Sequence, residues 1–181
     1  MPEPSVETAQ DNTIFSTKNV VHRLNMSRDF HRGLPGGGSV TAGFAGDDTR
    51  SHLEMNPEGD YASVIWDAGD SFDMYALDPE DGMYYSPYTT AEGGESAVFT
   101  TTYGLPEVDN YYCFTSEVSG YGDLTSQGLG VIFLTNIPVS QAATIGSPDP
   151  EADVSVALSS SPSENLFFRS ATSFLKATGG V

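Results

Sequence analysis

The sequence has little cysteine and no long hydrophobic run, and each shortage excludes a class of protein. A single cysteine, Cys113, excludes an internal disulfide and any metal site built from several cysteines. The longest aliphatic and aromatic run spans only residues 131–134, far short of the roughly 20 apolar residues of a transmembrane helix. The first residues, MPEPSVETAQDN, are polar and acidic, so we expect no signal peptide and synthesis in a cytoplasm.

Positive charge is also scarce. Seven Lys and Arg stand against 25 Asp and Glu, which gives a net charge of −18 at pH 7. The imbalance is local, because residues 51–168 hold 19 acids and no Lys or Arg, whereas residues 1–50 hold five bases and six acids. Binding to nucleic acid depends on neutralising phosphates with basic side chains. We therefore expect no direct nucleic-acid binding.

The acidic residues have a physical consequence for the solvent that the protein needs. A net charge this far from zero repels itself and weakens the compact state in dilute buffer. At about 1 M salt the Debye length falls to about 3 Å, so the repulsion nearly vanishes. A disordered acidic tail would lack aromatic residues, but here ten Phe, nine Tyr and one Trp accompany the acids. We expect a folded protein from a halophile.

Short β-strand patterns recur along the chain, separated by turn signals rich in Gly, Pro, Asn and Asp. Residues 165–176 fit either a strand or a short amphipathic helix, and no long helix is indicated. Phe72, Met74 and Ala76 alternate with polar neighbours, as in a half-buried strand. The predicted strands are 13–21, 39–45, 51–55, 61–66, 71–77, 97–103, 110–118, 129–136 and 152–158.

This series of strands predicts an all-β fold, a single jelly-roll β-sandwich or barrel. We expect an extended N-terminal arm at residues 1–12 and one jelly-roll domain at 13–181. Strand 61–66 is predicted to pair with 71–77, and the glycine-rich segment 33–38 to be a flexible turn. Long connections around 83–95, 119–128 and 138–150 indicate crossovers between sheets.

Patterns that carry chemistry are missing. The three histidines, His22, His31 and His52, have no metal-ligand spacing. No nucleophile-elbow motif of the G-x-S-x-G type is present, and the triple glycine at 36–38 lacks the Lys-Ser/Thr of a phosphate-binding loop. We predict no catalytic residue, no metal ligand and no cofactor, and hence a protein that is not an enzyme.

Acidic clusters and the lone thiol leave alternatives open. The clusters 67–73 and 78–81 could hold a hard cation through carboxylate oxygens, but the spacing favours solvated turns. Cys113 lies in an aromatic segment, which favours a buried free thiol because free cysteine behaves as a small hydrophobe. The alternative for Cys113 is an intermolecular disulfide within an assembled particle.

The few basic residues gather in one segment, where four cations stand against a single acid, Asp29. In a chain otherwise nearly free of positive charge, such a cluster suggests a use. It can pair with acidic surfaces of neighbouring subunits or face anionic lipid headgroups, and we favour subunit contact. The predicted contact residues are Lys18, Arg23, Arg28 and Arg32.

The acidic opening MPEPSVETAQ and the strand-rich body through residue 158 resemble a known family. They are similar to the small major capsid proteins of tailless icosahedral haloarchaeal viruses with an internal membrane, the sphaerolipovirus group. The resemblance implies an upright single jelly roll in the virion capsid, packed with copies of itself and a second, larger major capsid protein over a lipid membrane. It implies no catalytic residues.

Two other classes compete with a capsid protein. A halophilic surface or carbohydrate-binding β-sandwich could use the nine Tyr and Trp66 as a platform for sugars, although such a secreted module would call for a signal peptide. A hydrolase or isomerase on a β scaffold would need ionisable residues clustered in one pocket. Fold alone does not decide between them, because jelly rolls carry out all three kinds of function.

Overall fold

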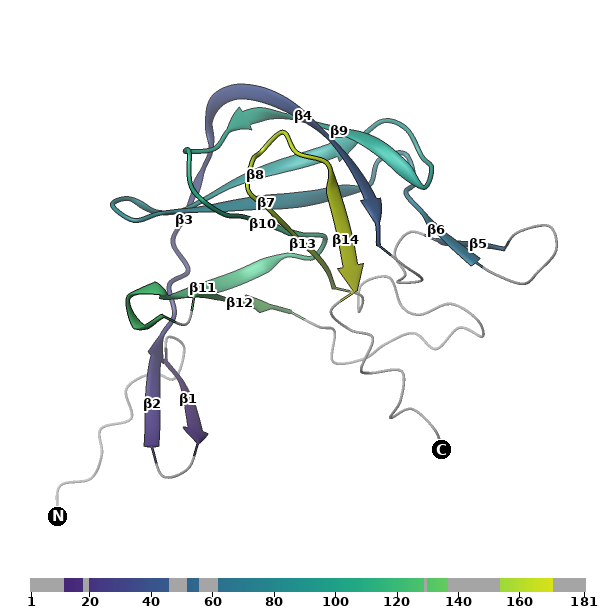
Figure 1. Cartoon of the computed structure of the whole chain (residues 1–181). Coiled ribbons are helices and arrows are strands. Elements are labelled where there is room, and N and C mark those ends of the chain that lie inside the picture. Colours follow the sequence, from purple (N-terminus) through teal and green to yellow (C-terminus); the bar gives the residue numbers. More distant parts are fainter. Residues whose placement is uncertain are drawn as a thin grey trace, which may run out of the picture. The chain divides into compact units, whose positions relative to one another are not determined.

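The computed structural model describes residues 12–17, 20–45, 52–55, 62–128, 130–136 and 154–170 (Figure 1). These residues form β-strands and one short 3-10 helix, so the predicted all-β class is confirmed. None of them lies in a helix long and apolar enough to span a membrane. The chain divides into two compact units, one of residues 1–29 and 118–135 and the other of residues 30–117 and 136–181.

The smaller unit consists of two antiparallel hairpins. The first joins β1 (Asn12–Thr17) to β2 (Val20–Asn25), and the second joins β11 (Val118–Leu124) to β12 (Gly130–Thr135) through a 3-10 turn at Thr125–Gln127. Ser27 and Tyr121 link the hairpins through two main-chain hydrogen bonds of 2.7 and 2.9 Å. Buried Met26, Val118 and Tyr121 supply its apolar contacts.

The larger unit is a closed barrel of seven strands in the order β8-β7-β10-β13-β14-β4-β9, with β9 returning to β8. Strand β3 pairs with β8 outside this ring, and β5 pairs only with β6. The strands are β3 (Phe30–Arg32), β4 (Leu34–Phe44), β5 (His52–Met55), β6 (Ala62–Ile65), β7 (Ser71–Asp78), β8 (Gly82–Thr90), β9 (Ser96–Gly104), β10 (Tyr111–Phe114), β13 (Ser155–Ser159) and β14 (Leu166–Ser170).

The ring closes through one parallel pairing. Each antiparallel pairing reverses the strand direction, so a closed ring must contain an even number of them, and a ring of seven strands needs at least one parallel pair. That pair is β14–β4, with Leu166 opposite Ala42 and Phe168 opposite Phe44. The first and last strands of the barrel in sequence therefore lie side by side, where Figure 1 shows β14 next to β4.

The middle of the ring is a Greek key. Strands β7, β8 and β9 follow one another as antiparallel neighbours, and β10 then returns to pair with β7. Three hairpin-connected strands with a fourth beside the first define this motif, which is the building block of jelly rolls. A single jelly-roll-like barrel is thus the architecture that the strand pattern predicted.

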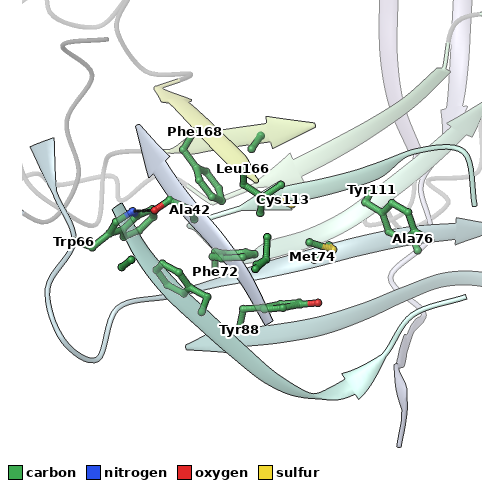
Figure 2. Close-up of a cluster of buried hydrophobic side chains, with 14 residues drawn as sticks. Ala42, Trp66, Phe72, Met74, Ala76, Tyr88, Tyr111, Cys113, Leu166 and Phe168 are labelled. Atoms are coloured by element: carbon green, nitrogen blue, oxygen red, sulfur yellow. Dashed lines mark hydrogen bonds between the residues drawn. The ribbon is translucent and has the colours of Figure 1, made fainter. Parts of the chain in front are cut away.

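Aromatic side chains fill the barrel (Figure 2). The predicted alternation on β7 is confirmed, because Phe72, Met74 and Ala76 are all buried and belong to this core. Tyr88 stacks on Phe72 with ring centroids 5.1 Å apart, and Trp66 meets Phe99 edge to face at 4.8 Å. Burying several rings of this size contributes much of the favourable free energy of folding.

The predicted pairing of strand 61–66 with 71–77 is wrong. Strand β6 pairs with β5 instead, while β7 pairs with β8 and β10. The expected turn exists, because the Asp70 amide donates to the Asp67 carbonyl at 3.1 Å. Trp66, the residue between β6 and this turn, exchanges two main-chain hydrogen bonds with Gly94 and places its indole in the core. These contacts explain why β6 does not form a hairpin with β7.

Two predicted connections contain strands. The segment 83–95 is mostly strand β8. A strand was not predicted there because the segment contains Pro87, and proline cannot donate a hydrogen bond to a β-ladder. The segment 119–128 holds most of β11 and the 3-10 turn. The third predicted connection, 138–150, lies outside the described residues.

The predicted flexible turn at 33–38 is also wrong, because most of these residues begin β4, the longest strand of the barrel. A Cβ on Gly37 would lie 2.7 Å from the Thr101 carbonyl oxygen, so glycine here permits close approach of β4 to β9. Near the N-terminus, the predicted single strand 13–21 is a hairpin of β1 and β2. The ambiguous segment 165–176 is a strand as far as Ser170, and the rest is outside the described residues.

The predicted domain boundaries, an arm at residues 1–12 and one domain at 13–181, stay predictions. Of the expected arm at residues 1–12, only Asn12 is described, as the first residue of β1. The prediction that residues 13–181 form one jelly-roll domain stays a prediction beside the division into two compact units.

Candidate functional site

The four predicted contact residues fall into different parts of the structure. Lys18 lies outside the described residues. Arg23 is on β2, where only the backbone is described, and Arg28 is exposed in the segment that follows β2. Arg32 ends β3, in the barrel unit. Two of the four therefore belong to the smaller unit and one to the barrel, and a common patch stays a prediction.

Arg32 stacks on aromatic side chains. Its guanidinium carbon lies 4.6 Å from the ring centroid of Tyr103 and 5.9 Å from that of Tyr85. Beside it, the rings of His31 and Tyr84 have centroids 5.2 Å apart. A cation over an aromatic face is attracted by the ring quadrupole. The pairing of β3 with β8 thus places Arg32 over tyrosine rings on one face of these strands, while His31 and Tyr84, one position earlier, lie on the opposite face.

Asp73 is the carboxylate most affected by its surroundings. Burial raises the pKa of Asp73 above its ordinary value of 3.8, the Tyr75 hydroxyl opposes this by donating a hydrogen bond at 3.4 Å, Glu117 adds to the rise and Arg32 counters it. Tyr75 is thus the hydrogen-bond partner of this carboxylate, and Glu117 and Arg32 act on it through their charges. Asp73 therefore adds a pH-sensitive element to β7.

The two acidic clusters are used in turns. The Asp67 amide donates to Oδ2 of Asp70 at 2.8 Å. Oδ1 of Asp78 accepts from the amides of Glu80 and Asp81 at 2.8 and 3.2 Å. Among the described residues, no three or more His, Cys, Asp and Glu side chains are arranged to hold a metal ion. The carboxylates of Asp70 and Asp78 thus stabilise local turns, in agreement with the interpretation of these segments as turns, whereas Asp73 of the first cluster lies on β7.

Cys113 lies inside the barrel, between Met74 on β7 and Ala157 on β13. Its side chain has no exposed surface, and burial raises the pKa of its thiol far above the ordinary value. The predicted burial of Cys113 is confirmed, and its state as a free thiol stays a prediction. A disulfide to another chain would require the barrel to open, because the sulfur atoms must approach to about 2 Å.

Trp66 is 2% exposed and cannot form part of an exposed sugar platform, which corrects that part of the carbohydrate-binding alternative. Its indole N–H donates to the Ala42 carbonyl in the core. Tyr88 and Tyr111 are buried as well, whereas Tyr84 and Tyr85 on β8, Tyr103 on β9 and Tyr112 on β10 are partly exposed. A large share of the aromatic residues therefore serves folding.

The most unusual surface of the barrel is one that the sequence did not reveal. Leu158 on β13, Phe167 on β14 and Val98 on β9 point outward and are 66%, 64% and 49% exposed. Leu158 and Phe167 lie on the adjacent strands β13 and β14, and Val98 lies further round the ring on β9, with β4 between β14 and β9. We call the outward-facing side of these four strands the apolar wall.

Leu158 faces outward because the alternating positions of β13 that face inward hold small residues. On β13 the residues that face the barrel interior are Ser155, Ala157 and Ser159. The interior near β13 is already occupied by large rings such as Phe72 and Phe168, so only small side chains fit there. The larger residues of β13 are consequently turned to the surface.

Charge is nearly absent from the barrel strands. Among the seven strands of the ring, the only acids are Asp73 and Asp78, both on β7, and the only base is Arg169 on β14. The other described acids of this unit lie outside the ring, Glu54 on β5 and the rest in connections between strands. The apolar wall therefore carries no carboxylate in a chain whose net charge is −18.

Comparison with known proteins gives no assignment. No family model matches the chain, and neither a curated protein nor a solved structure matches it. The function must therefore be argued from the distribution of charge, apolar surface and buried groups described above.

Proposed function

We propose that this chain is a structural subunit of a viral capsid, a single jelly-roll-like barrel that packs into an icosahedral shell over an internal membrane in a virus of halophilic archaea. The observation that carries the proposal is the apolar wall. Exposed Leu158, Phe167 and Val98, on strands that carry no carboxylate in a chain of net charge −18, are suited to burial against another protein. In this role the protein is not an enzyme and needs no cofactor.

The mechanical properties of the barrel fit this role. Each strand of the closed ring is paired on both sides, so the ring itself offers no strand edge to a neighbour. The aromatic interior fixes the shape of the ring. Acids in the connections hold water and hydrated cations, and molar salt screens their repulsion between neighbouring subunits.

The partners of such a subunit are copies of itself and, following the family resemblance, a second, larger major capsid protein. Arg23, Arg28 and Arg32, together with Lys18, remain the proposed cationic contacts to acidic surfaces of those partners or to membrane lipids. Residence in the virion capsid after synthesis in a host cytoplasm follows from the same proposal.

A carbohydrate-binding module is the alternative, and one observation favours it. Tyr85 and Tyr103 are partly exposed around Arg32, and exposed aromatic rings can stack on sugars. Trp66, in contrast, is buried and is not available for such stacking. A structural subunit accounts for the apolar wall, which the alternative leaves unexplained.

Sedimentation velocity of the purified chain tests the proposal, with sodium chloride varied from about 3 M to about 0.1 M. A structural subunit is expected to form discrete large species in molar salt that dissociate as salt is removed, because repulsion between acidic surfaces grows as screening weakens. A monomer at every salt and protein concentration would contradict the proposal. If that monomer bound to sugars on a glycan array and Tyr103→Ala abolished the binding, the carbohydrate-binding alternative would be supported.

A further inference from the structure

Strand β7 carries a second set of packed side chains, on the outside of the barrel. Core residues alternate along this strand, so Asp73 and Tyr75, which lie between them, point outward. Tyr75 is nevertheless only 3% exposed. Its ring meets those of Phe30 and Phe114 edge to face, with centroids 5.7 and 5.9 Å apart. The outer side of β7 is therefore covered by rings from β3 and from β10.

The two covering segments stand at the ends of the longest continuous part of the barrel unit, which runs from residue 30 to residue 117. Phe30 begins this part as the first residue of β3, which ends in Arg32. Phe114 ends β10, and Glu117 follows as the last residue of the same part. We call residues 30–33 the entry segment and residues 114–117 the exit segment.

Asp73 meets one charge from each segment, and the two charges have opposite signs. The Arg32 cation of the entry segment attracts its carboxylate, whereas Glu117 of the exit segment repels it. The same carboxylate is partly buried and accepts a hydrogen bond from the Tyr75 hydroxyl at 3.4 Å. Its cross-strand neighbours on β8 and β10 are a proline and a phenylalanine, so neither adds a charge. Ionisation of Asp73 thus acts in opposite senses on the two segments.

We propose that Asp73 is a pH-dependent switch that sets which of the two segments is held more firmly against the barrel. The ionised carboxylate retains the entry segment through Arg32. It loosens the exit segment, because opening there separates it from Glu117 and lets water reach a charge that is costly to bury. The protonated carboxyl lacks this charge, so the exit segment closes over it.

The direction of the Asp73 pKa agrees with this switch. Burial is the largest cause of its rise above the ordinary value of 3.8, and the effect of Glu117 is larger than that of Arg32. The folded protein therefore holds the proton with the exit segment closed, and that segment opens more often as the pH rises through the raised pKa. Salt screens partly buried charges less than exposed ones, so the switch persists as salt is added.

Two main-chain hydrogen bonds report separately on the two segments. The Gly33 amide donates to the Tyr85 carbonyl at 2.8 Å at the end of the entry segment. The Thr115 amide donates to the Ser155 carbonyl at 3.1 Å within the exit segment. Each amide exchanges with deuterium when its own segment opens, so its protection measures that local opening.

Hydrogen exchange followed by NMR on the full-length chain tests the switch, at the lowest salt concentration that keeps it folded. Each rate is divided by the intrinsic rate of an unstructured amide at the same pH. From about pH 4 to about pH 7, the protection of Thr115 should fall at least about threefold relative to that of Gly33. In Asp73→Asn the ratio should be the same at both pH values. Asp109→Asn, which removes an exposed acid of the β9–β10 connection, should keep the change of the wild type.

A second variant tests the part played by the like charge. Glu117 is exposed, so Glu117→Gln should fold normally, and it should reduce the change in the Thr115 ratio because it removes the repulsion of Asp73. A full change in Glu117→Gln would overturn the role given to Glu117.

Two results would overturn the switch itself. Equal changes in protection at Thr115 and Gly33 would show that Asp73 affects only the stability of the whole fold. A change in their ratio that persists in Asp73→Asn would show that another group is responsible. Neither readout requires the chain to associate, so this inference stands or fails independently of the proposed function.

Discussion

The indole N–H of Trp66 donates a hydrogen bond of 2.9 Å to the main-chain carbonyl of Ala42, entirely within the core. Trp66 directly follows β6, and Ala42 lies on β4, next to the parallel pairing that closes the ring. The same indole packs against Phe44 at 4.3 Å and Phe168 at 5.6 Å. The Trp66 side chain thus connects the β5–β6 hairpin to β4 and β14, the two strands whose parallel pairing closes the barrel.

Replacing Trp66 with Phe should lower the free energy of unfolding by about 1–3 kcal/mol, because the ring stays apolar while the Ala42 carbonyl loses its indole donor. Trp66→Ala should cost more, about 3–5 kcal/mol, since it also leaves a cavity. Because Trp66 is the only tryptophan, unfolding is followed by circular dichroism in guanidinium chloride. Equal stability of Trp66→Phe and the wild type would contradict a structural role for the hydrogen bond.

Cys113 should be unreactive in the folded protein. Its side chain has no exposed surface, and burial raises its thiol pKa, so little thiolate is present or accessible. An aromatic disulfide reagent is expected to label it at least about 100-fold more slowly than the unfolded chain, and only as the barrel unfolds.

The same residue tests the alternative of an intermolecular disulfide. After oxidation without denaturant, non-reducing electrophoresis should show a monomer, whereas oxidation after partial unfolding should give a linked dimer. A disulfide-linked dimer that forms in the native state and keeps the native circular dichroism would contradict the interior position of Cys113.

Asp73 makes the barrel less stable as the pH rises. Because burial raises its folded-state pKa, the folded protein holds this proton more tightly than the unfolded chain does. The favourable contribution is fully present below the ordinary value of 3.8 and is lost as the pH rises through the raised pKa. Asp73→Asn, which imitates the neutral form and keeps an acceptor for Tyr75, should therefore be more stable than the wild type at pH 7.

The pH profile of that variant is the decisive readout. Chemical unfolding in molar salt should give a higher free energy of unfolding for Asp73→Asn than for the wild type at pH 7. This difference should shrink toward zero near pH 3. Asp109→Asn is the control, because Asp109 is exposed in the β9–β10 connection. A variant that is less stable than the wild type at pH 7 would overturn the assignment of desolvation as the dominant cause.

The contribution of Glu164 to the stability of the fold should depend on pH in the opposite direction to that of Asp73. Its Oε2 accepts hydrogen bonds from the hydroxyls of Ser160 and Ser159 and from the Ser160 amide, and these lower its pKa below the ordinary value of 4.5. The stabilisation is present above pH 4.5 and is lost as the pH falls through the lowered pKa.

Glu164→Gln should consequently be less stable than the wild type at pH 7, and the difference should disappear in acid. The same unfolding series as for Asp73 measures it. Glu107→Gln, an exposed glutamate for which no such hydrogen bonds are found, should track the wild type at every pH. A pH-independent loss in Glu164→Gln would show that its role in the β13–β14 connection does not depend on charge.

Much of the architecture could be predicted from the sequence, because strands with a clear alternation, such as β7, signal both their limits and their buried face. Turns with Asp, Pro and Gly were equally clear, and Asp78 caps its turn as expected. Pairing was less predictable. Strands that are neighbours in sequence often pair, but β6 does not pair with β7, because Trp66 is buried in the core. The local sequence pattern does not indicate that Trp66 is buried there.

The candidate interface could not be predicted from the sequence, since exposure depends on the fold. Leu158 and Phe167 are ordinary strand residues in the printed sequence, and only the crowded interior explains why Leu158 faces outward. The approach of β14 to β4 likewise comes from ring closure between distant segments. The basic residues were visible at once, yet Arg32 stacks on Tyr103 rather than standing as an isolated charge.

The central claim is that this chain builds an ordered shell, and electron microscopy of the material that sediments from molar salt tests it most directly. We predict closed particles or sheets with a regular repeat, which disperse when the salt is lowered and do not form from Phe167→Ser under the same conditions. Amorphous aggregates, or fields of single barrels at every salt concentration, would contradict the account.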